Sequence, residues 1–199
     1  MSAHNTEITG NPVTISRRNY ETVGSYQVTL RSRGRNFSEE IRYYYKSGYI
    51  RMEFIQPFRG AVVTYDPTRK EVRLKPLRML NRVISLSPDS HVVRSSAGHR
   101  IDESDIGSLL RAVARLQANG RTCVAGERFL SGREIIFVRV KGNGDAAVCG
   151  AHSYDLWLDK GSYLPLKVVS YDLKDGLIEE VIMDDLKTDV DLADCLFHL

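Results

Sequence analysis

Hydrophobic and polar residues alternate along most of the chain, which is the pattern of half-buried β-strands. The first such run begins at Ser25, where Tyr26, Val28 and Leu30 alternate with polar neighbours. The later runs are separated by tight turns, as in an antiparallel meander. They cover residues 41–46, 49–55, 61–66, 71–75, 82–86, 122–128, 133–141, 154–158, 164–171 and 177–186.

The clearest predicted hairpin turns at Ser47 and Gly48, a two-residue connection with a glycine that tolerates a positive φ. One face of this hairpin is predicted to be apolar and the other charged, so a slip of one residue would bury an arginine and a glutamate. Counting outward from the turn pairs Tyr45 with Ile50, Tyr43 with Met52 and Ile41 with Phe54 on the first face, and Arg42 with Glu53 and Tyr44 with Arg51 on the second.

A second hairpin is predicted around residues 159–162, and a third turns at Asp175-Gly176. In the second hairpin Trp157 points away from the leucine-bearing face. Pro165 cannot donate a hydrogen bond to a neighbouring strand, so its strand should lie at a sheet edge or beside a bulge. The leucines expected to face each other are Leu156 and Leu158 on one strand and Leu164 and Leu166 on the next.

The period changes to that of a helix between residues 106 and 116. Asp102–Asp105 supply a cap and acidic side chains for its first turn, and Asn119-Gly120 ends it. The apolar stripe consists of Ile106, Leu109, Leu110, Val113 and Leu116. A shorter helix is predicted around Ser16–Thr22, within a lead-in segment of residues 1–24 that precedes a single domain of residues 25–199.

The predicted fold class is therefore α+β and mostly β. A strongly curved antiparallel sheet forms a half-open barrel, with one main helix, and with room for the short N-terminal one, against its concave face. One helix cannot cover a sheet of this many strands, so the sheet must curl on itself. A curled sheet of this size can enclose a small apolar ligand, or it can be filled by its own side chains. The residues alone leave both alternatives open.

Composition and charge exclude several classes. The chain has 199 residues, 42% of them hydrophobic and 27% charged, and a net charge of +3. This charge is too small and too dispersed to indicate nucleic acid as a partner. No apolar run approaches the roughly 20 residues of a membrane-spanning helix. Residues 1–11 are polar and show no leader sequence, which fits either a cytosolic protein or an exported one whose leader has been removed.

No catalytic or metal-binding motif is apparent, and we predict neither enzymatic activity, nor a metal site, nor a cofactor. The five histidines occur singly, and no nucleophile elbow of the GxSxG type occurs. Residues 142–144 resemble a phosphate loop but open no helix, so they read as a turn. The acidic residues between 179 and 191 lack the spacing of a calcium-binding loop and read as a solvated face.

The chain contains three cysteines, Cys123, Cys149 and Cys195, without a CxxC spacing. Cys123 and Cys149 lie near neighbouring predicted strands. A disulfide between them and three unpaired thiols both remain open at this stage.

Several segments together resemble the LolA/LolB-like superfamily of bacterial lipoprotein carriers, which includes the sensor domain of RseB. The resemblance extends from about Tyr26 to Phe197. It is carried by the order of the elements, by the mid-chain helix and by the segments Lys46-Ser-Gly-Tyr-Ile-Arg-Met-Glu-Phe54, Val63-Thr-Tyr-Asp-Pro67, Leu156-Trp-Leu-Asp159 and Leu164-Pro-Leu-Lys167. It implies a bent antiparallel sheet with helices as a lid over a hydrophobic cavity that takes up acyl chains.

The resemblance further implies a periplasmic protein without its leader, acting in outer-membrane lipoprotein sorting or transport. Its expected partners are lipid acyl chains or lipoproteins, and an envelope membrane protein; the alternative is a sensor or protein-interaction module like RseB. The carriers have a longer N-terminal helix and an arginine that locks the lid. No residue of this chain can be assigned to that arginine; Arg59 only lies near its place in the order of the elements. The residues predicted to line the cavity are Tyr43, Tyr45, Met52, Phe54, Val63, Leu110, Val113 and Trp157.

Overall fold

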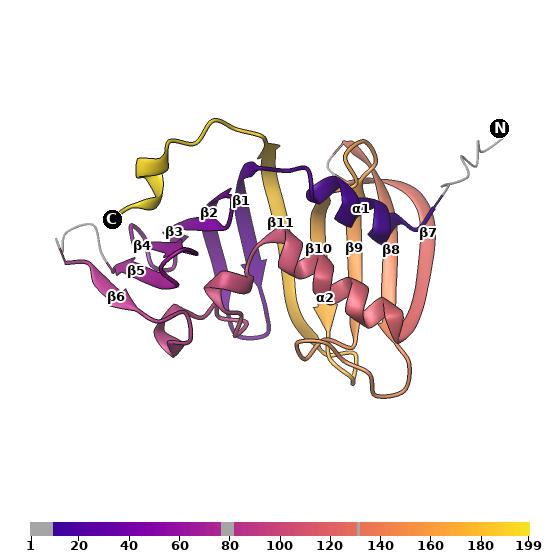
Figure 1. Ribbon diagram of the computed structural model, residues 1–199. Coiled ribbons are helices and arrows are strands. Elements are labelled where there is room, and N and C mark those ends of the chain that lie inside the picture. The colour runs from indigo at the N-terminus through magenta and orange to yellow at the C-terminus, as the bar shows by residue number, and fades with distance from the viewer. Residues whose placement is uncertain (1–9, 77–81, 131) are drawn as a thin grey trace.

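The computed structural model describes residues 10–76, 82–130 and 132–199, so the predicted lead-in before residue 10 lies outside the described part (Figure 1). The described residues form one 11-stranded sheet in the order β6-β5-β4-β3-β2-β1-β11-β10-β9-β8-β7. Neighbouring strands are antiparallel throughout. The strands are β1 Ser25–Arg33, β2 Ser38–Lys46, β3 Tyr49–Gln56, β4 Val62–Asp66, β5 Glu71–Lys75, β6 Ile84–Leu86, β7 Gly120–Leu130, β8 Arg133–Gly142, β9 Ser153–Asp159, β10 Pro165–Tyr171 and β11 Leu177–Thr188.

The sheet is strongly bent and stays open. Figure 1 shows β7–β11 almost face-on, whereas β2–β6 turn until they are seen nearly end-on. The end strands β6 and β7 lie at opposite ends of the strand order and do not pair with each other. Both helices lie on the concave side. The structure thus confirms the predicted α+β fold class, a half-open barrel of antiparallel strands with a main helix against it.

The hairpin of β2 and β3 has the predicted register in every pair. Tyr43 lies opposite Met52, Ile41 opposite Phe54, and Arg42 opposite Glu53. Ser47 and Gly48 take the positive φ values of 48° and 90° that a two-residue turn requires. The alternation of apolar and charged side chains therefore sets which residues face the concave side here.

The hairpin of β9 and β10 differs from the prediction in two respects. Leu158 pairs with Pro165, and the register shifts between Pro165 and Lys167, so Val168, and not a leucine, lies opposite Leu156. Strand β10 also lies inside the sheet, between β9 and β11. Of the two places that proline allows, the structure uses the irregularity within a strand and not the edge.

The main helix, α2, spans Ile106–Ala118 and matches the predicted stripe and stop. Asp105 caps it by accepting a hydrogen bond from the Ser108 amide at 3.1 Å. The N-terminal helix, α1, spans Pro12–Tyr20 and so begins and ends earlier than the predicted Ser16–Thr22. Its cap is Asn11, whose side chain accepts from the Val13 amide at 3.0 Å, with proline in the first turn.

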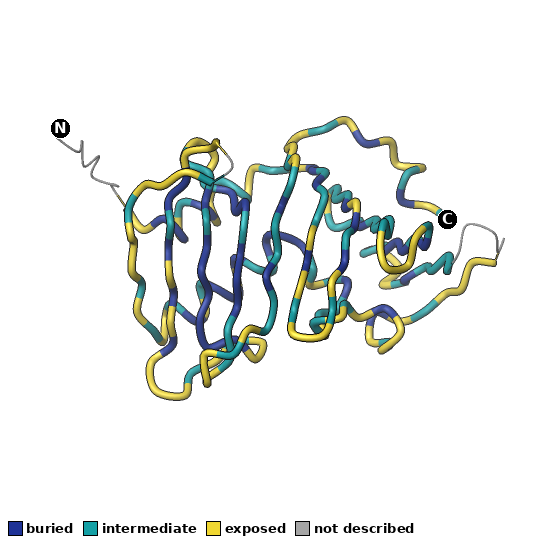
Figure 2. The backbone as a smooth tube through the Cα atoms, turned by 180° about the vertical axis from the view of Figure 1, so that it is seen from behind, coloured by how far each residue is buried: buried dark blue, intermediate teal, exposed yellow. Residues whose placement is uncertain are grey.

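The core lies between the sheet and α2. Figure 2 shows that buried residues concentrate in the central strands of one half, whereas β7 at the edge is largely exposed. On the convex face charged residues pair across strands, for example Arg31 with Asp184 and Arg33 with Glu180. Acidic residues of β11 therefore neutralise Arg31 and Arg33 on this face. Cys123, Cys149 and Cys195 are all unpaired and exposed, which settles the open alternative in favour of free thiols.

Candidate functional site: an apolar cavity under the helix

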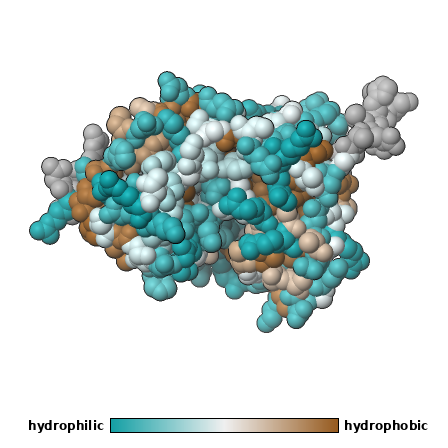
Figure 3. Space-filling model, in the orientation of Figure 1, coloured by the Kyte–Doolittle hydropathy of each residue, from teal (hydrophilic) through white to brown (hydrophobic). Residues whose placement is uncertain are grey.

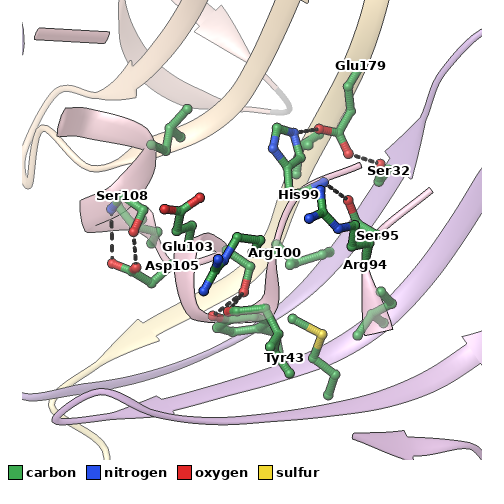
Figure 4. Close-up of a pocket in the computed structure, with 18 of the residues that line it drawn as sticks. Ser32, Tyr43, Arg94, Ser95, His99, Arg100, Glu103, Asp105, Ser108 and Glu179 are labelled. Carbon is green, nitrogen blue, oxygen red and sulfur yellow. Dashed lines mark hydrogen bonds and ion pairs between the residues drawn. The ribbon is translucent and has the colours of Figure 1, made fainter. Parts of the chain in front are cut away.

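A cavity of about 1030 Å³ lies between the concave face of the sheet and its cover, which is α2 together with segment 91–105. This volume is at the upper end of the range of about 300–1,000 Å³ for ligand pockets. Most of the lining is aliphatic or aromatic. The contributions of the strands include Val28 and Leu30 of β1, Ile41 and Tyr43 of β2, Met52 and Phe54 of β3, Val63 of β4, Leu74 of β5, Tyr154 of β9, Val168 of β10, and Val181 and Met183 of β11. Figure 4 shows part of the wall, with polar groups on the segment that covers it.

Four of the residues predicted to line the cavity do so: Tyr43, Met52, Phe54 and Val63. Three of them lie in one row across the sheet, because Tyr43 pairs with Met52 and Met52 pairs with Val63. Leu74 of β5 extends the row, since it pairs with Val63. Side chains that pair across strands point to the same face, so one transverse band of the wall is built from four different strands.

The other predicted residues lie elsewhere, and none of them is among the residues that line the cavity. Leu110 and Val113 are 1% and 0% exposed, in the core between α2 and the sheet. Tyr45 stacks on Tyr26 with ring centroids 5.0 Å apart. Trp157 lies on the convex face, because Leu156 and Leu158 beside it point into the core. There its ring meets Phe137 edge-on at 4.9 Å, and Lys167 Nζ lies 4.9 Å from its centroid.

Sequence reasoning missed the wall that β11 provides and the cover that segment 91–105 provides. Val181 and Met183 line the cavity and alternate along β11, so the predicted strand pattern could have indicated them. Segment 91–105 contains only two short 3₁₀ turns, His91–Val93 and Ile101–Glu103. It carries no periodic apolar stripe, and nothing in its sequence predicted its position over the sheet.

Tyrosine hydroxyls hold the start of α2 in place. The Ile106 amide donates to Tyr26 Oη at 3.2 Å, and Tyr20 Oη donates to Asp105 Oδ1 at 3.0 Å. Tyr43 Oη lies 3.2 Å from Ser104 Oγ. Burial raises the pKa of Tyr26 and of Tyr43 above their ordinary value, so both remain protonated and can donate. The hydrogen bonds of these three tyrosines therefore hold the start of α2 above the concave face.

Two polar contacts fasten segment 91–105 to the sheet. Ser96 Oγ donates to Glu39 on β2. Figure 4 shows the second contact, in which His99 Nε2 lies 3.1 Å from Glu179 Oε2 on β11. Glu179 also accepts from Ser32 Oγ on β1 at 2.5 Å. The segment is thus anchored on both sides of β1. The hydrogen bond to Glu179 raises the pKa of His99, and partial burial opposes this rise.

The anchor at His99 predicts a dependence of stability on pH. Its pKa in the folded protein lies above the unfolded value of about 6.5, so its contribution is complete below that pH and is lost as pH rises through the higher folded pKa. We expect the melting temperature of the protein to exceed that of a His99→Gln variant most at mildly acidic pH, while glutamates are still ionised. Thermal unfolding over a pH series measures this, and a difference that stays constant across neutral pH would contradict the anchor.

The arginines of the cover are engaged in part. Arg100 forms a pair with Asp102 at 2.8 Å and another with Asp89. The guanidinium of Arg100 lowers the pKa of Asp102.

Among the described residues no cluster of histidine, cysteine, aspartate or glutamate could hold a metal ion. No helix in the described ranges has the length and hydrophobicity to cross a membrane.

The bent, open antiparallel sheet with an apolar cavity under a helix is the arrangement that the resemblance to the LolA/LolB-like superfamily implied. The sequence model of the family described as the MucB/RseB N-terminal domain matches residues 70–197, more than half of the chain. The chain belongs to this family. No curated protein sequence matches it.

Solved structures share the fold at low sequence identity. An uncharacterized conserved protein from Thermus thermophilus is 15% identical, with 94% of this chain and 91% of that one covered and a TM-score of 0.58. The MucA/MucB complex from Pseudomonas aeruginosa matches at 15% identity and a TM-score of 0.56, covering 94% of this chain and 59% of that one. The lipoprotein LppX from Mycobacterium tuberculosis matches at 11% identity and a TM-score of 0.54, over 92% and 96%. These identities support likeness of fold alone.

Proposed function

We propose that the protein binds the acyl chain of a lipid or lipoprotein in the cavity, without catalysis. The observation that carries this proposal is the volume of about 1030 Å³ with a largely aliphatic and aromatic wall. Burial of an acyl chain gains about 0.8 kcal/mol per methylene group, so roughly 16 carbons gain on the order of 12 kcal/mol before the costs of ordering and desolvation. Met52 at the centre of the wall suits an adaptable site, because its side chain is flexible and polarizable.

The polar groups of the cavity support binding better than chemistry. Within the described residues, His99 contacts Glu179 and Tyr43 contacts Ser104, and no serine or cysteine side chain is hydrogen-bonded to a histidine ring, since Ser95 Oγ accepts only from the backbone amide of His99. A nucleophile activated by a base needs such a contact. These contacts instead hold the cover on the sheet.

At the level of the family, the chain is a lipoprotein-binding carrier or a protein-interaction module. We favour a carrier or sorting role in the cell envelope, with the periplasm as its compartment. The second candidate is a periplasmic sensor that binds a protein partner. It is favoured by the likeness to MucB, which was solved in complex with MucA. The open cavity favours a lipid ligand in either role.

The test begins with the protein as purified. We expect extraction with organic solvent, followed by mass spectrometry, to release a lipid, and the delipidated protein to bind a fluorescent fatty acid that a natural lipid displaces. A pure interaction module would release nothing and would leave the probe in water. That result would reject the lipid-binding function.

A further inference from the structure

Two exposed hydrophobic side chains lie at the rim of the cavity. Phe58 in the turn between β3 and β4 is 59% exposed, and Val92 in segment 91–105 is 69% exposed. Both also line the cavity. Neither packing in the core nor closure of the cavity accounts for large apolar side chains in this position. Apolar surface at the rim of a pocket often marks an interaction site.

The two side chains belong to the same end of the cavity. Segment 91–105 reaches the sheet where Ser96 donates to Glu39, at the start of β2. The next residue of β2, Glu40, pairs with Gln56, the last residue of β3 before the turn that carries Phe58. Figure 1 shows segment 91–105 passing below the ends of these strands, and in Figure 3 hydrophobic surface gathers at the end of the molecule formed by β4–β6.

The apolar surface continues from the rim into the interior. The ring of Phe58 meets the ring of Phe54 edge-on, with centroids 6.0 Å apart, and Phe54 lies in the cavity wall. On the neighbouring edge strand, Ile84 is 44% exposed and pairs with Leu74, another residue of the wall. A hydrocarbon chain that enters here would contact apolar groups from the outside to the centre.

The same rim carries positive charge. Arg59 follows Phe58, and Arg94 lies two residues after Val92; both arginines are exposed. Neither forms an ion pair with any residue that the structure describes. The acidic side chain nearest in sequence to Arg94 is Asp89, which is paired with Arg100, and the one nearest to Arg59 is Glu53, which is paired with Arg51. The rim therefore presents hydrophobic groups beside guanidinium groups that form no ion pair with a described residue, which suits a surface with acyl chains beneath anionic phosphates.

We propose that the rim, defined by Phe58, Arg59, Val92 and Arg94, docks on an anionic lipid bilayer, so that an acyl chain passes into the cavity without crossing water. This proposal rests on the proposed lipid-binding function and names the surface from which the ligand comes. Phe58 and Val92 insert at the boundary between headgroups and acyl chains. Arg59 and Arg94 bind the phosphates, and each contributes about fivefold to the affinity for an anionic surface.

Co-sedimentation with vesicles tests the docking. We expect the protein to bind vesicles of phosphatidylcholine that contain phosphatidylglycerol, and Phe58→Glu with Val92→Glu to lower that binding at least tenfold. Arg59→Gln with Arg94→Gln should reduce binding to the anionic vesicles and leave the weak binding to pure phosphatidylcholine unchanged. The matched control is Phe129→Glu, because Phe129 is 75% exposed but lies on β7 and away from the cavity lining.

Uptake of a fluorescent fatty acid added as monomers separates this proposal from the function on which it rests. Arg59→Gln should take up the monomeric probe as the unchanged protein does, because Arg59 does not line the cavity, and it should extract the same probe from anionic vesicles about fivefold more slowly. If the protein does not bind the vesicles, or if Phe129→Glu reduces binding as much as the rim variants do, the docking surface is wrong. A protein that binds vesicles through the rim but takes up no monomeric probe would instead reject the cavity as the binding site.

Discussion

Replacing Met52 and Phe54 together by glutamate will abolish uptake of a fluorescent fatty acid. Both side chains lie in the cavity wall, on the same face of β3. A carboxylate placed there must either lose its hydration beside the hydrocarbon or keep water in the cavity, and either outcome costs several kcal/mol. We expect the affinity to fall at least about 100-fold, which corresponds to roughly 3 kcal/mol. Equilibrium titration with the probe measures this loss.

The matched control is Ile55→Glu on the same strand. Ile55 lies between Phe54 and Gln56, where the register between β2 and β3 shifts, and its side chain is not among those that line the cavity. This variant adds a negative charge to β3 without adding one to the cavity, so uptake should remain. Equal losses in the control and in the double variant would show that charge on β3, and not the cavity wall, governs uptake.

Truncating Leu110 to alanine will destabilise the protein by about 2–5 kcal/mol, the cost of deleting a buried leucine side chain and leaving a void. Leu110 is 1% exposed and faces the core under α2. Its neighbour Leu109 is only partly buried and lines the ligand cavity. Leu109→Ala enlarges a space that already exists, so it should cost less than half as much.

The free energy of unfolding from denaturant titrations measures both effects. Probe binding under native conditions should change in the reverse order, because Leu109 contacts the cavity and Leu110 does not. If both variants lost similar stability, the division between a dry core and a hollow cavity along α2 would be wrong. The comparison is direct since the two residues are adjacent on one helix.

The sequence predicted those parts of the fold in which local pattern and tertiary packing agree. In the hairpin of β2 and β3, a slip of one residue would bury Arg42 and Glu53, so a single register is tolerated, and it is the one observed. For α2 the cap at Asp105 and the stripe from Ile106 to Leu116 indicate the same helix. Agreement between levels makes such elements predictable.

Other features depend on partners distant in the sequence. The start of α1 at Pro12 had a local signal, Asn11 followed by proline, which outweighed the weaker pattern that placed the helix later. By contrast, β1 pairs with β11, near the other end of the chain, and no local pattern encodes that neighbour.

The candidate site shows the same limit. Tyr43, Met52, Phe54 and Val63 were predictable because a strand pattern shows which residues share a face. The pattern does not show whether a buried side chain meets another side chain or an empty volume. Leu110 and Val113 therefore looked equivalent to the wall residues, although they fill the core.

The row Tyr43, Met52, Val63 and Leu74 has a consequence for the choice of cargo. These side chains come from four neighbouring strands and pair with one another across the sheet, so together they set the width of the cavity at one cross-section. Exchanging any of them for a larger or smaller apolar residue would narrow or widen the cavity, while every backbone hydrogen bond between the strands stays in place. Single substitutions in this row could therefore adapt the cavity of related proteins to thinner or bulkier acyl chains.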